Sequence, residues 1–282
     1  MKNQTAIVTG TSSGFGLITS VALAGKGFTV IAAMRNCEKK GKLLQEAQKH
    51  GVESNIIVHE LDVTNVGSIK AFQTWINDEF GRVDVLVNNA GYAGAGFVEE
   101  VSMDEYRKQF DTNVFGVIAV TKAFLPLMRR QKRGCIINIS SISGRVAFPG
   151  LSPYVASKYA IEGWSESLRL EMKHFGVKVV LIEPGSYKTN IWSTGKQVAV
   201  ESLHSHSPYH AYMQKIEGYI AKGENSFGNP EDVAKEIAEI ATLPNPGIRY
   251  PIGTGVKATI FLKNLLPWRI WEKIVLSKLF GK

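Results

Sequence analysis

The sequence predicts an α/β fold, with a doubly wound and mostly parallel sheet flanked by helices on both faces. Three observations predict it. Short apolar runs rich in Val and Ile alternate with longer segments of helical periodicity along most of the chain. The short runs are hydrophobic on both faces, as strands covered by helices on both sides must be. A glycine-rich turn joins the first run to the first helical segment, which is typical of a nucleotide-binding βαβ unit.

The predicted elements follow one another in the order β-α-β-α with short turns. We expect strands over residues 5–8, 29–33, 56–60, 83–87, 135–139 and 177–182. We expect helices over residues 15–24, 39–49, 66–80, 103–130 and 153–175. No linker rich in Pro, Gly or Ser interrupts the series, so a single Rossmann-type domain over residues 1–250 accounts for it.

Residues 186–227, after the last predicted strand, break this alternation. The stretch is polar and aromatic and contains His204, His206 and His210. A long insertion after the carboxyl end of a strand lies where open α/β sheets bind ligands. Glu201 is the only other metal-ligand type at a usable spacing, so we expect loop histidines and no metal site.

Residues 251–282 form a second exception, a basic amphipathic extension. Trp268, Trp271, Val275 and Leu279 stand at helical spacing, with lysines and an arginine between them. Such a helix packs over its own active site or against a partner subunit, or it lies on an anionic membrane surface. We expect packing on protein, with peripheral membrane contact as the alternative.

Composition and charge exclude several classes of protein. Hydrophobic residues make up 44% and charged residues 21% of the 282 positions, unlike disordered, collagen-like or coiled-coil chains. The net charge is +8, but residues 257–282 alone hold six basic residues and one acidic residue. Because the rest of the chain is near balance, we expect no nucleic-acid partner.

The sequence also bears on location. It opens with no apolar leader and cleavage site, and it has no uncharged apolar run of about eighteen residues, so we expect neither secretion nor a membrane span. Cys37 and Cys135 are its only cysteines, which predicts no disulfide framework and no cysteine metal cluster. Two reduced thiols agree with a cytoplasmic protein.

The first strand ends in a turn that we expect to hold a dinucleotide. Its sequence is Thr9-Gly10-Thr11-Ser12-Ser13-Gly14-Phe15-Gly16. Glycines let the backbone turn tightly and approach a pyrophosphate. The free N–H groups at the start of the following helix favour its negative charge.

Further motifs follow this turn in a fixed order. They are Asp62-Val63, Asn88-Asn89-Ala90-Gly91, Asn113, Ser141, Tyr154-x-x-x-Lys158, and Pro184-Gly185 through Thr189. With the T-G-x-x-x-G-x-G spacing of the turn, they resemble the short-chain dehydrogenase/reductase family over residues 5–190. The turn, with an arginine after the second strand, most resembles the branch that includes hydroxysteroid and retinol dehydrogenases.

The resemblance implies four catalytic residues, Asn113, Ser141, Tyr154 and Lys158. Tyr154 and Lys158 are four apart in a helix and share one face. An ammonium beside a phenol lowers its pKa from about 10 toward the neutral range. Ser141 is placed to hold a substrate carbonyl toward Tyr154, so both are predicted substrate contacts. By resemblance, Asn113 supports a proton relay, while the cofactor supplies the hydride.

The resemblance also implies a larger set of cofactor contacts. They are Gly10, Ser12, Ser13, Gly14, Phe15, Gly16, Arg35, Asp62, Val63, Asn89, Ala90, Gly91, Tyr154, Lys158, Pro184, Gly185 and Thr189. It implies that residues 186–227 form a substrate lid. It further implies that helices 103–130 and 153–175 form the interface of a homodimer or homotetramer.

The end of the second strand indicates which cofactor is used. An NAD site places an acidic residue there to bond the ribose 2′-hydroxyl, but this position is Met34. Arg35 follows, and its guanidinium suits a 2′-phosphate. Ser13 offers a further hydroxyl. We therefore expect NADP(H) in preference to NAD(H).

Together these features predict an NADP(H)-dependent oxidoreductase. It would transfer a hydride between nicotinamide and a secondary alcohol, ketone or aldehyde that is bulky and apolar, with Tyr154 as the acid–base group. The alternative is a non-catalytic NADP(H) sensor that regulates a partner. The presence of both Tyr154 and Lys158 favours the enzyme.

Overall fold

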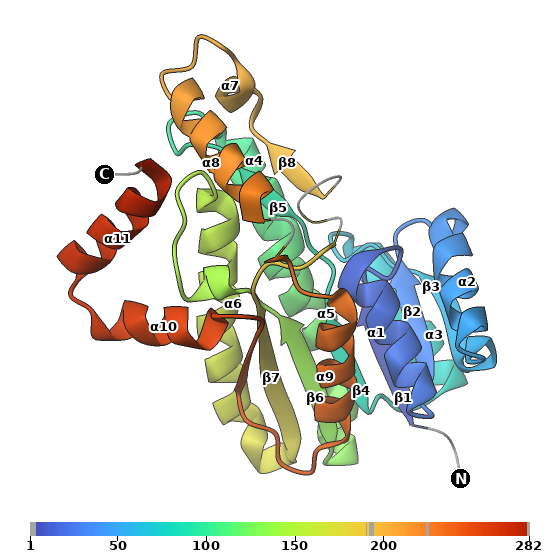
Figure 1. Ribbon diagram of the computed structural model, residues 1–282. Helices are drawn as coiled ribbons and strands as arrows, with labels where there is room; N and C mark the ends of the chain where they lie inside the picture. The colour runs from blue at the N-terminus through green and yellow to red at the C-terminus, as the bar shows by residue number, and fades with distance from the viewer. Residues whose placement is uncertain (1–3, 190, 192–194, 224–225, 281–282) are drawn as a thin grey trace.

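A seven-stranded parallel sheet forms the centre of the fold, in a computed structural model that describes residues 4–189, 191, 195–223 and 226–280 (Figure 1). The strands lie in the order β3-β2-β1-β4-β6-β7-β9, and each neighbouring pair is parallel. Their bounds are β1 (Thr5–Thr9), β2 (Thr29–Met34), β3 (Ile56–Glu60), β4 (Val85–Asn88), β6 (Gly134–Ile139), β7 (Val177–Pro184) and β9 (Arg249–Ile252). The strand order reverses between β1 and β4, the switch point at which open α/β sheets bind ligands. The predicted fold class is confirmed.

Helices cover both faces of this sheet. One face carries α1 (Gly14–Gly25), α2 (Gly41–Lys49) and α9 (Pro230–Thr242). The other carries α3 (Val66–Glu79), α5 (Val117–Gln131) and α6 (Ser152–Met172). Short 3₁₀ turns lie at Cys37–Lys40, Glu53–Asn55, Ile142–Gly144 and Lys173–Phe175.

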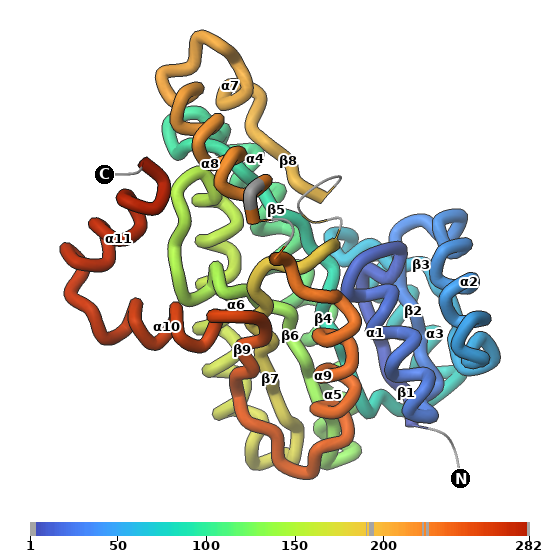
Figure 2. Tube along the Cα trace, in the orientation of Figure 1, coloured from blue at the N-terminus to red at the C-terminus, as the bar shows by residue number. Residues whose placement is uncertain are grey.

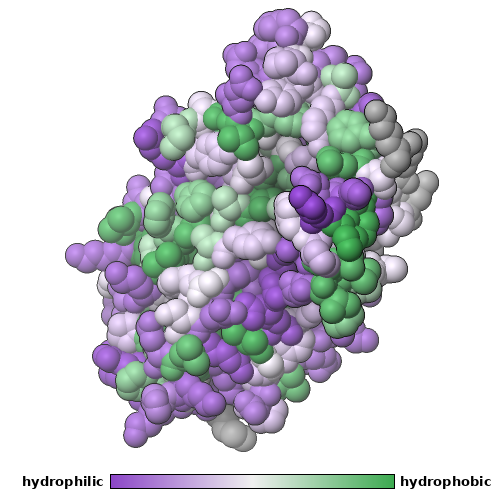
Figure 3. All heavy atoms as spheres, turned by 90° about the vertical axis from the view of Figure 1, so that its left-hand side faces the viewer, coloured by the Kyte–Doolittle hydropathy of each residue, from purple (hydrophilic) through white to green (hydrophobic). Residues whose placement is uncertain are grey.

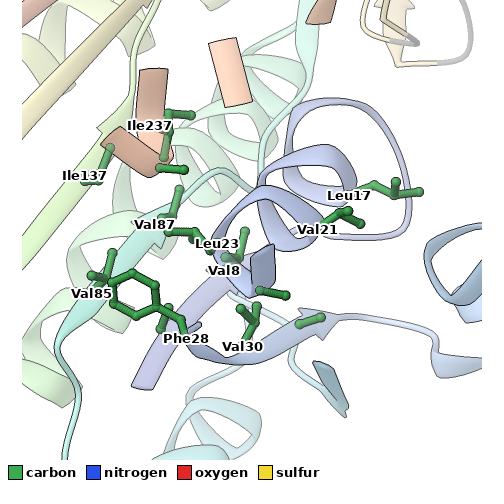
Figure 4. Packing of buried hydrophobic residues seen from close by; sticks show 14 of the residues in the cluster. Val8, Leu17, Val21, Leu23, Phe28, Val30, Val85, Val87, Ile137 and Ile237 are labelled. Carbon is green, nitrogen blue, oxygen red and sulfur yellow. The ribbon is translucent and has the colours of Figure 1, made fainter. Parts of the chain in front are cut away.

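Successive side chains of each strand enter two separate cores, as the two-residue period of a strand requires. In β1, Ala6 and Val8 face the core under α1 and α9, whereas Ile7 faces the core under α3 and α5. Figure 4 shows the first core, in which Leu23 of α1 lies beside Val8 and Ile237 of α9 lies on the side of Val87 and Ile137. Because these side chains are fully buried, each large one stabilises the fold by roughly 1.5–3 kcal/mol.

The single helix predicted over residues 103–130 is interrupted. The chain forms α4 (Met103–Phe110), then a π-helical turn over Asp111–Gly116, and then α5. The wider turn includes Asn113, whose side chain is buried. Apolar periodicity could not reveal this turn, because one extra residue barely changes a pattern spread over many turns.

Three strands were not predicted. β5 (Ala93–Ala95) and β8 (Lys196–Val198) form a separate parallel pair, and β9 lies at the edge of the main sheet. All three are short, and β9 has the sequence Arg-Tyr-Pro-Ile with each residue only partly buried. They therefore lack the continuous apolar run that marked the other strands.

One helical stretch in the described chain, Met103–Gln131, is long and apolar enough to cross a membrane by length and composition alone. In the fold, its residues Val120, Phe124 and Met128 are fully buried beneath the sheet. Its apolar character therefore serves packing inside the domain.

The chain after β7 builds the upper and outer parts of the molecule. It forms β8, α7 (Val200–Leu203) and α8 (His210–Gly223) before α9, and α10 (Val256–Leu265) and α11 (Trp268–Phe280) after β9. Figure 2 shows α11 returning toward α8, and the two helices are in contact. The predicted extension is therefore a pair of helices, the second of which reaches the stretch predicted as a lid.

Candidate active site

A cleft of about 900 Å³ opens at the carboxyl ends of the parallel strands. It runs from the turn after β1, past the ends of β2, β4 and β6, to the segment after β7. Its volume lies within the range of pockets that bind cofactors or small ligands, roughly 300–1,000 Å³. The cleft lies at the switch point of the sheet, where such ligands bind.

The glycine turn after β1 forms one wall. Gly10 and Gly14 have φ angles of +71° and +57°, which L side chains rarely adopt. A Cβ on Gly10 would lie 2.8 Å from the Cα of Ala90. The side chain of Asn89 fixes the turn, because its Nδ2 donates to the carbonyl oxygens of Thr9 at 2.8 Å and Gly10 at 3.1 Å.

The start of α1 is suited to an anion. Its N-cap residue Ser13 makes no side-chain capping bond, and its first turn holds no acidic residue. Ser12, Ser13, Gly14 and Phe15 all line the cleft. Backbone N–H groups at such a helix start favour a phosphate.

Gly16, one of the expected cofactor contacts, is not among the residues that line the cleft. It is buried beneath the turn, where a Cβ would collide with Asn89 Nδ2 and the carbonyl oxygen of Gly10. Its role in this structure is to let α1 approach the turn closely.

Charged groups gather at the far end of the cleft, beyond β2. Arg35 is exposed there, and Met34, Asn36 and Lys39 line the cleft beside it. Asp62 lies across from Arg35. Burial would raise the pKa of Asp62, but hydrogen bonds from Thr64 and the nearby Arg35 charge hold it below its ordinary value. Lys39 was not predicted as a site residue, because its sequence position suggested only the start of a helix.

Tyr154, Lys158 and Ser141 meet in the middle of the cleft. Tyr154 and Lys158 lie one turn apart in α6, with Lys158 Nζ 5.5 Å from the centre of the Tyr154 ring. Lys158 Nζ donates to the carbonyl oxygen of Ile139, at the end of β6, at 2.7 Å. Ser141 caps the 3₁₀ turn after β6, where its Oγ accepts from the Ser143 amide at 3.1 Å.

Burial controls the proton affinities of this group. It raises the pKa of Tyr154 to about 12, which the neighbouring Ser141 hydroxyl partly opposes. It lowers the pKa of Lys158 to about 8, which the Glu162 carboxylate partly opposes. We expected Lys158 to lower the pKa of Tyr154, but the pKa is raised instead, and burial is the largest cause. The Lys158 ammonium donates to the carbonyl oxygen of Ile139.

Asn113 lies behind the cleft rather than in its wall. Its Nδ2 donates to the carbonyl oxygen of Tyr92 at 3.0 Å and to Ser157 Oγ at 3.2 Å, and its Oδ1 accepts from the Tyr92 amide at 3.2 Å. Ser157 Oγ in turn donates to the carbonyl oxygen of Tyr154 at 2.7 Å. Asn113 therefore connects the Tyr92 loop, which lines the cleft, to the turn of α6 that holds Tyr154.

The segment after β7 closes the other side of the cleft with Gly185 and Thr189. The other residues predicted to contact the cofactor also line the cleft, namely Val63, Asn89, Ala90, Gly91 and Pro184. Tyr187 and Ile191 line it as well, and Tyr187 meets Phe15 edge to face at 5.6 Å between ring centres. No motif pointed to Tyr187, because a single aromatic residue in a loop carries no spacing signal.

The histidines of the 186–227 stretch do not converge with other ligand types. His204 and His206 stack with ring centres 5.0 Å apart, and His210 Nε2 lies 3.0 Å from Gln214. Among the described residues, no group of three or more His, Cys, Asp or Glu side chains could hold a metal ion.

Comparison with known proteins assigns the family. The family model described as short chain dehydrogenase matches residues 4–198, more than half of the chain. The chain belongs to this family. The short-chain dehydrogenase fold and the motifs identified in the sequence therefore agree.

Relatives span nearly the whole of this short-chain dehydrogenase. An uncharacterized oxidoreductase, YusZ of Bacillus subtilis (strain 168), is 48% identical over 282 residues, covering 100% of both chains. Retinol dehydrogenase 8 of Bos taurus is 34% identical over 275 residues, covering 94% of this chain and 86% of its own. The protein is thus an oxidoreductase of this family.

Solved structures match the same fold. A short-chain dehydrogenase from Streptomyces avermitilis superposes with a TM-score of 0.82 at 33% identity, over 97% of each chain. An actinorhodin polyketide ketoreductase solved with NADPH superposes with a TM-score of 0.73 at 29% identity, over 90% of this chain and 97% of its own. Complexes of this kind support nicotinamide-nucleotide binding in the cleft described above.

Proposed function

We propose that the protein is an NADP(H)-dependent oxidoreductase that interconverts a secondary alcohol and a ketone, or an alcohol and an aldehyde. One observation carries the proposal. Tyr154, Lys158 and Ser141 line the same cleft as the glycine turn. A proton donor and a dinucleotide-binding turn are the two parts that carbonyl reduction requires.

The residues of the cleft fit a bound dinucleotide. The start of α1 offers uncapped N–H groups to the pyrophosphate, and Gly14 leaves open space beside the turn, with Thr189 Cβ 3.8 Å from where a Cβ would stand. NADPH, when bound, supplies the hydride. The protein supplies the proton and holds the carbonyl in place.

In the reducing direction, Ser141 donates a hydrogen bond to the carbonyl oxygen and Tyr154 transfers its phenolic proton to that oxygen. A buried phenol with a pKa of about 12 is protonated at neutral pH, as a donor must be. Lys158, held by Ile139, stabilises the phenolate that the transfer leaves. Asn113, which lies behind the cleft, holds the Tyr92 loop and the turn of Tyr154 in place relative to each other.

Arg35 supports NADP(H) as the preferred cofactor. Met34 stands where an NAD site needs a carboxylate, and Arg35 and Lys39 bring two positive charges to that end of the cleft. A 2′-phosphate would neutralise them. The NADPH complex of the actinorhodin ketoreductase is consistent with this preference.

Aromatic and apolar residues support a bulky apolar substrate. Tyr92, Tyr187 and Ile191 line the cleft, and the retinol dehydrogenase in the family carries such a substrate in its name. Three further expectations stay predictions. They are that the stretch 186–227 forms a lid, that residues 1–250 form one domain, and that the protein is cytoplasmic.

A homo-oligomer stays a prediction too. Large apolar side chains are exposed in the π-helical turn before α5, at Phe115 (58%), and on α6, at Tyr159 (43%) and Leu170 (74%). An interface between copies on these helices would cover them.

The test is a fluorescence titration with NADPH and NADH, followed by a panel of ketones, aldehydes and quinones monitored at the nicotinamide absorbance. We expect tighter binding of NADPH and oxidation of NADPH by at least one apolar carbonyl compound. Binding without turnover across the panel would instead favour the alternative, a non-catalytic NADP(H) sensor.

A further inference from the structure

The two C-terminal helices have two apolar faces, only one of which is packed. Val256 and Ile260 of α10 and Trp271 of α11 are buried against Val146, in a small core that also includes Phe148. This inner face attaches the helices to the domain. A helix that only needed attachment would carry polar residues on its other side.

The outer face is instead rich in large apolar side chains. They are exposed by 64% at Phe261, 45% at Leu262, 65% at Leu265, 59% at Trp268 and 47% at Ile270. Positions 261, 262 and 265 lie on one side of α10, and the exposed positions 268 and 270 lie in the first turn of α11, directly after Pro267. Apolar side chains gathered in this way mark an interaction surface.

Most of the charged side chains on these two helices are positive. Over residues 254–280 the cationic side chains are Lys257, Lys263, Arg269, Lys273 and Lys278, and the single acidic one is Glu272. Lys263 Nζ lies 5.5 Å from the centre of the Trp268 ring, so charge and apolar surface are interleaved. Figure 3 looks onto the side of the molecule that carries α10 and α11, where green apolar patches alternate with purple hydrophilic ones.

The far end of α11 is also attached to the domain. Phe280 lies 4.7 Å from Tyr212 of α8 between ring centres, and Lys215 Nζ lies 4.8 Å from the centre of the Phe280 ring. The helix pair is therefore held at both ends. The junction between α10 and α11 projects from the body (Figure 1), so the outer face is already formed before anything binds to it.

We propose that the outer face of α10 and α11 docks on an anionic lipid bilayer. Leu, Phe and Trp side chains enter the boundary between headgroups and acyl chains, and the surrounding Lys and Arg side chains bind the anionic headgroups. Charge decides between this occupant and a second copy of the chain. Two copies that met on this face would bring ten positive charges against two negative ones, whereas an anionic bilayer complements all five cations.

The experiment uses the full chain and sedimentation with sucrose-loaded vesicles. One set is phosphatidylcholine alone and the other contains one third phosphatidylglycerol. We expect binding to the anionic vesicles and at least about tenfold weaker binding to the neutral ones. No substrate is present, so the outcome is independent of the proposed activity.

Two variants assign the binding to this face. Phe261→Ser/Leu265→Ser/Trp268→Ser removes apolar contacts, and Lys263→Glu/Arg269→Glu/Lys273→Glu reverses the charge. Each should weaken binding to anionic vesicles at least about tenfold. The matched controls are Val66→Ser, an exposed apolar residue on α3, and Lys42→Glu, an exposed lysine on α2, and both should bind as the parent does.

Absence of binding to anionic vesicles, or binding that neither triple variant weakens, would overturn the proposal. Analytical ultracentrifugation of the same proteins tests the rival occupant. A dimer that the apolar triple variant converts to a monomer, with no vesicle binding by the parent, would assign the face to a second copy instead.

Discussion

Asn113 bonds both the amide and the carbonyl group of Tyr92, with its Oδ1 3.2 Å from the amide nitrogen and its Nδ2 3.0 Å from the carbonyl oxygen. One buried side chain thus satisfies two backbone groups of the loop after β4. The third bond, to Ser157 Oγ at 3.2 Å, extends this connection to α6. Asn113 therefore acts on the site through the residues it positions.

Replacing Asn113 tests that role. Asn113→Ala leaves the Tyr92 amide without its partner, while the Tyr92 carbonyl oxygen keeps only the bond from Gln109 Nε2 at 3.1 Å. The unpaired buried amide lowers the free energy of unfolding by ~1–3 kcal/mol. We expect kcat to fall as well, because the Tyr92 loop and the Tyr154 turn lose their common support. Urea unfolding and steady-state kinetics measure the two effects. A variant as stable as the parent but with a collapsed kcat would show that Asn113 acts directly in proton transfer.

Tyr154→Phe tests the proton donor. The phenylalanine ring fills the same buried space, so NADPH affinity should stay within about twofold, while kcat falls by at least ~10²-fold because the acid is gone. Tyr159→Phe is the control, since this tyrosine of the same helix is 43% exposed and lies outside the cleft. Turnover retained by Tyr154→Phe would remove Tyr154 from its proposed role.

Arg35→Asp tests cofactor choice. It replaces a cation that suits a 2′-phosphate by a carboxylate that suits a 2′-hydroxyl. The KM for NADPH should rise about tenfold or more, with a smaller change in the KM for NADH. Lys42→Asp, an exposed lysine outside the cleft, should change neither. An unaltered ratio of the two KM values would show that Arg35 does not select the cofactor. Lys39, which also lines this end of the cleft, would then be the next residue to test.

Much of this site followed from the sequence because its residues carry short, fixed spacings. The glycine turn, Tyr154 with Lys158, and Ser141, which the family resemblance implied as site residues, line one cleft. The roles of Gly16 and Asn113 did not follow, since both residues act by close packing or bonding behind the wall. Such contacts depend on where Asn89 and Tyr92 lie in three dimensions, which spacing along the chain does not encode.

The fold shows the same division. Strands with continuous apolar runs were predicted within a few residues, because burial on both faces leaves that mark in the sequence. β9 at the sheet edge and the three-residue β5 and β8 bury too little apolar surface to leave it. The π-helical turn at Asn113 is set by tertiary contacts and was invisible for that reason.

The pKa of Lys158, lowered by burial to about 8, predicts the pH dependence of carbonyl reduction. Above that pH the amine becomes neutral and no longer stabilises the phenolate left on Tyr154. The value of kcat/KM for reduction should therefore fall as pH rises through about 8. Lys158→Arg keeps its charge throughout this range. The fall of kcat/KM around pH 8 should therefore disappear in this variant, even though its kcat is reduced. If kcat/KM of the variant still fell at the same pH, the titration would belong to another group.

Glu183 predicts a pH-dependent stability. It is buried at the end of β7 near the carboxylate of Glu162, with Arg145 Nη1 and Arg249 Nε each 3.2 Å from its Oε1. Burial, and after it the Glu162 charge, raise the pKa of Glu183 from 4.5 to about 7, although both arginines oppose this. The folded protein therefore keeps a proton that the unfolded chain has already lost over this range.

The sign of the effect follows from that difference. The stabilisation is complete below the ordinary glutamate pKa and is lost as pH rises through about 7. We expect the free energy of unfolding to fall between about pH 5 and pH 8, by at most about 3 kcal/mol from this group. Glu183→Gln cannot titrate, so this part of the slope should vanish in the variant, while Glu231→Gln, exposed at the start of α9, should keep it. Urea unfolding of the three proteins across this range decides the matter, because a slope that persists in Glu183→Gln would trace the pH dependence to a group other than Glu183.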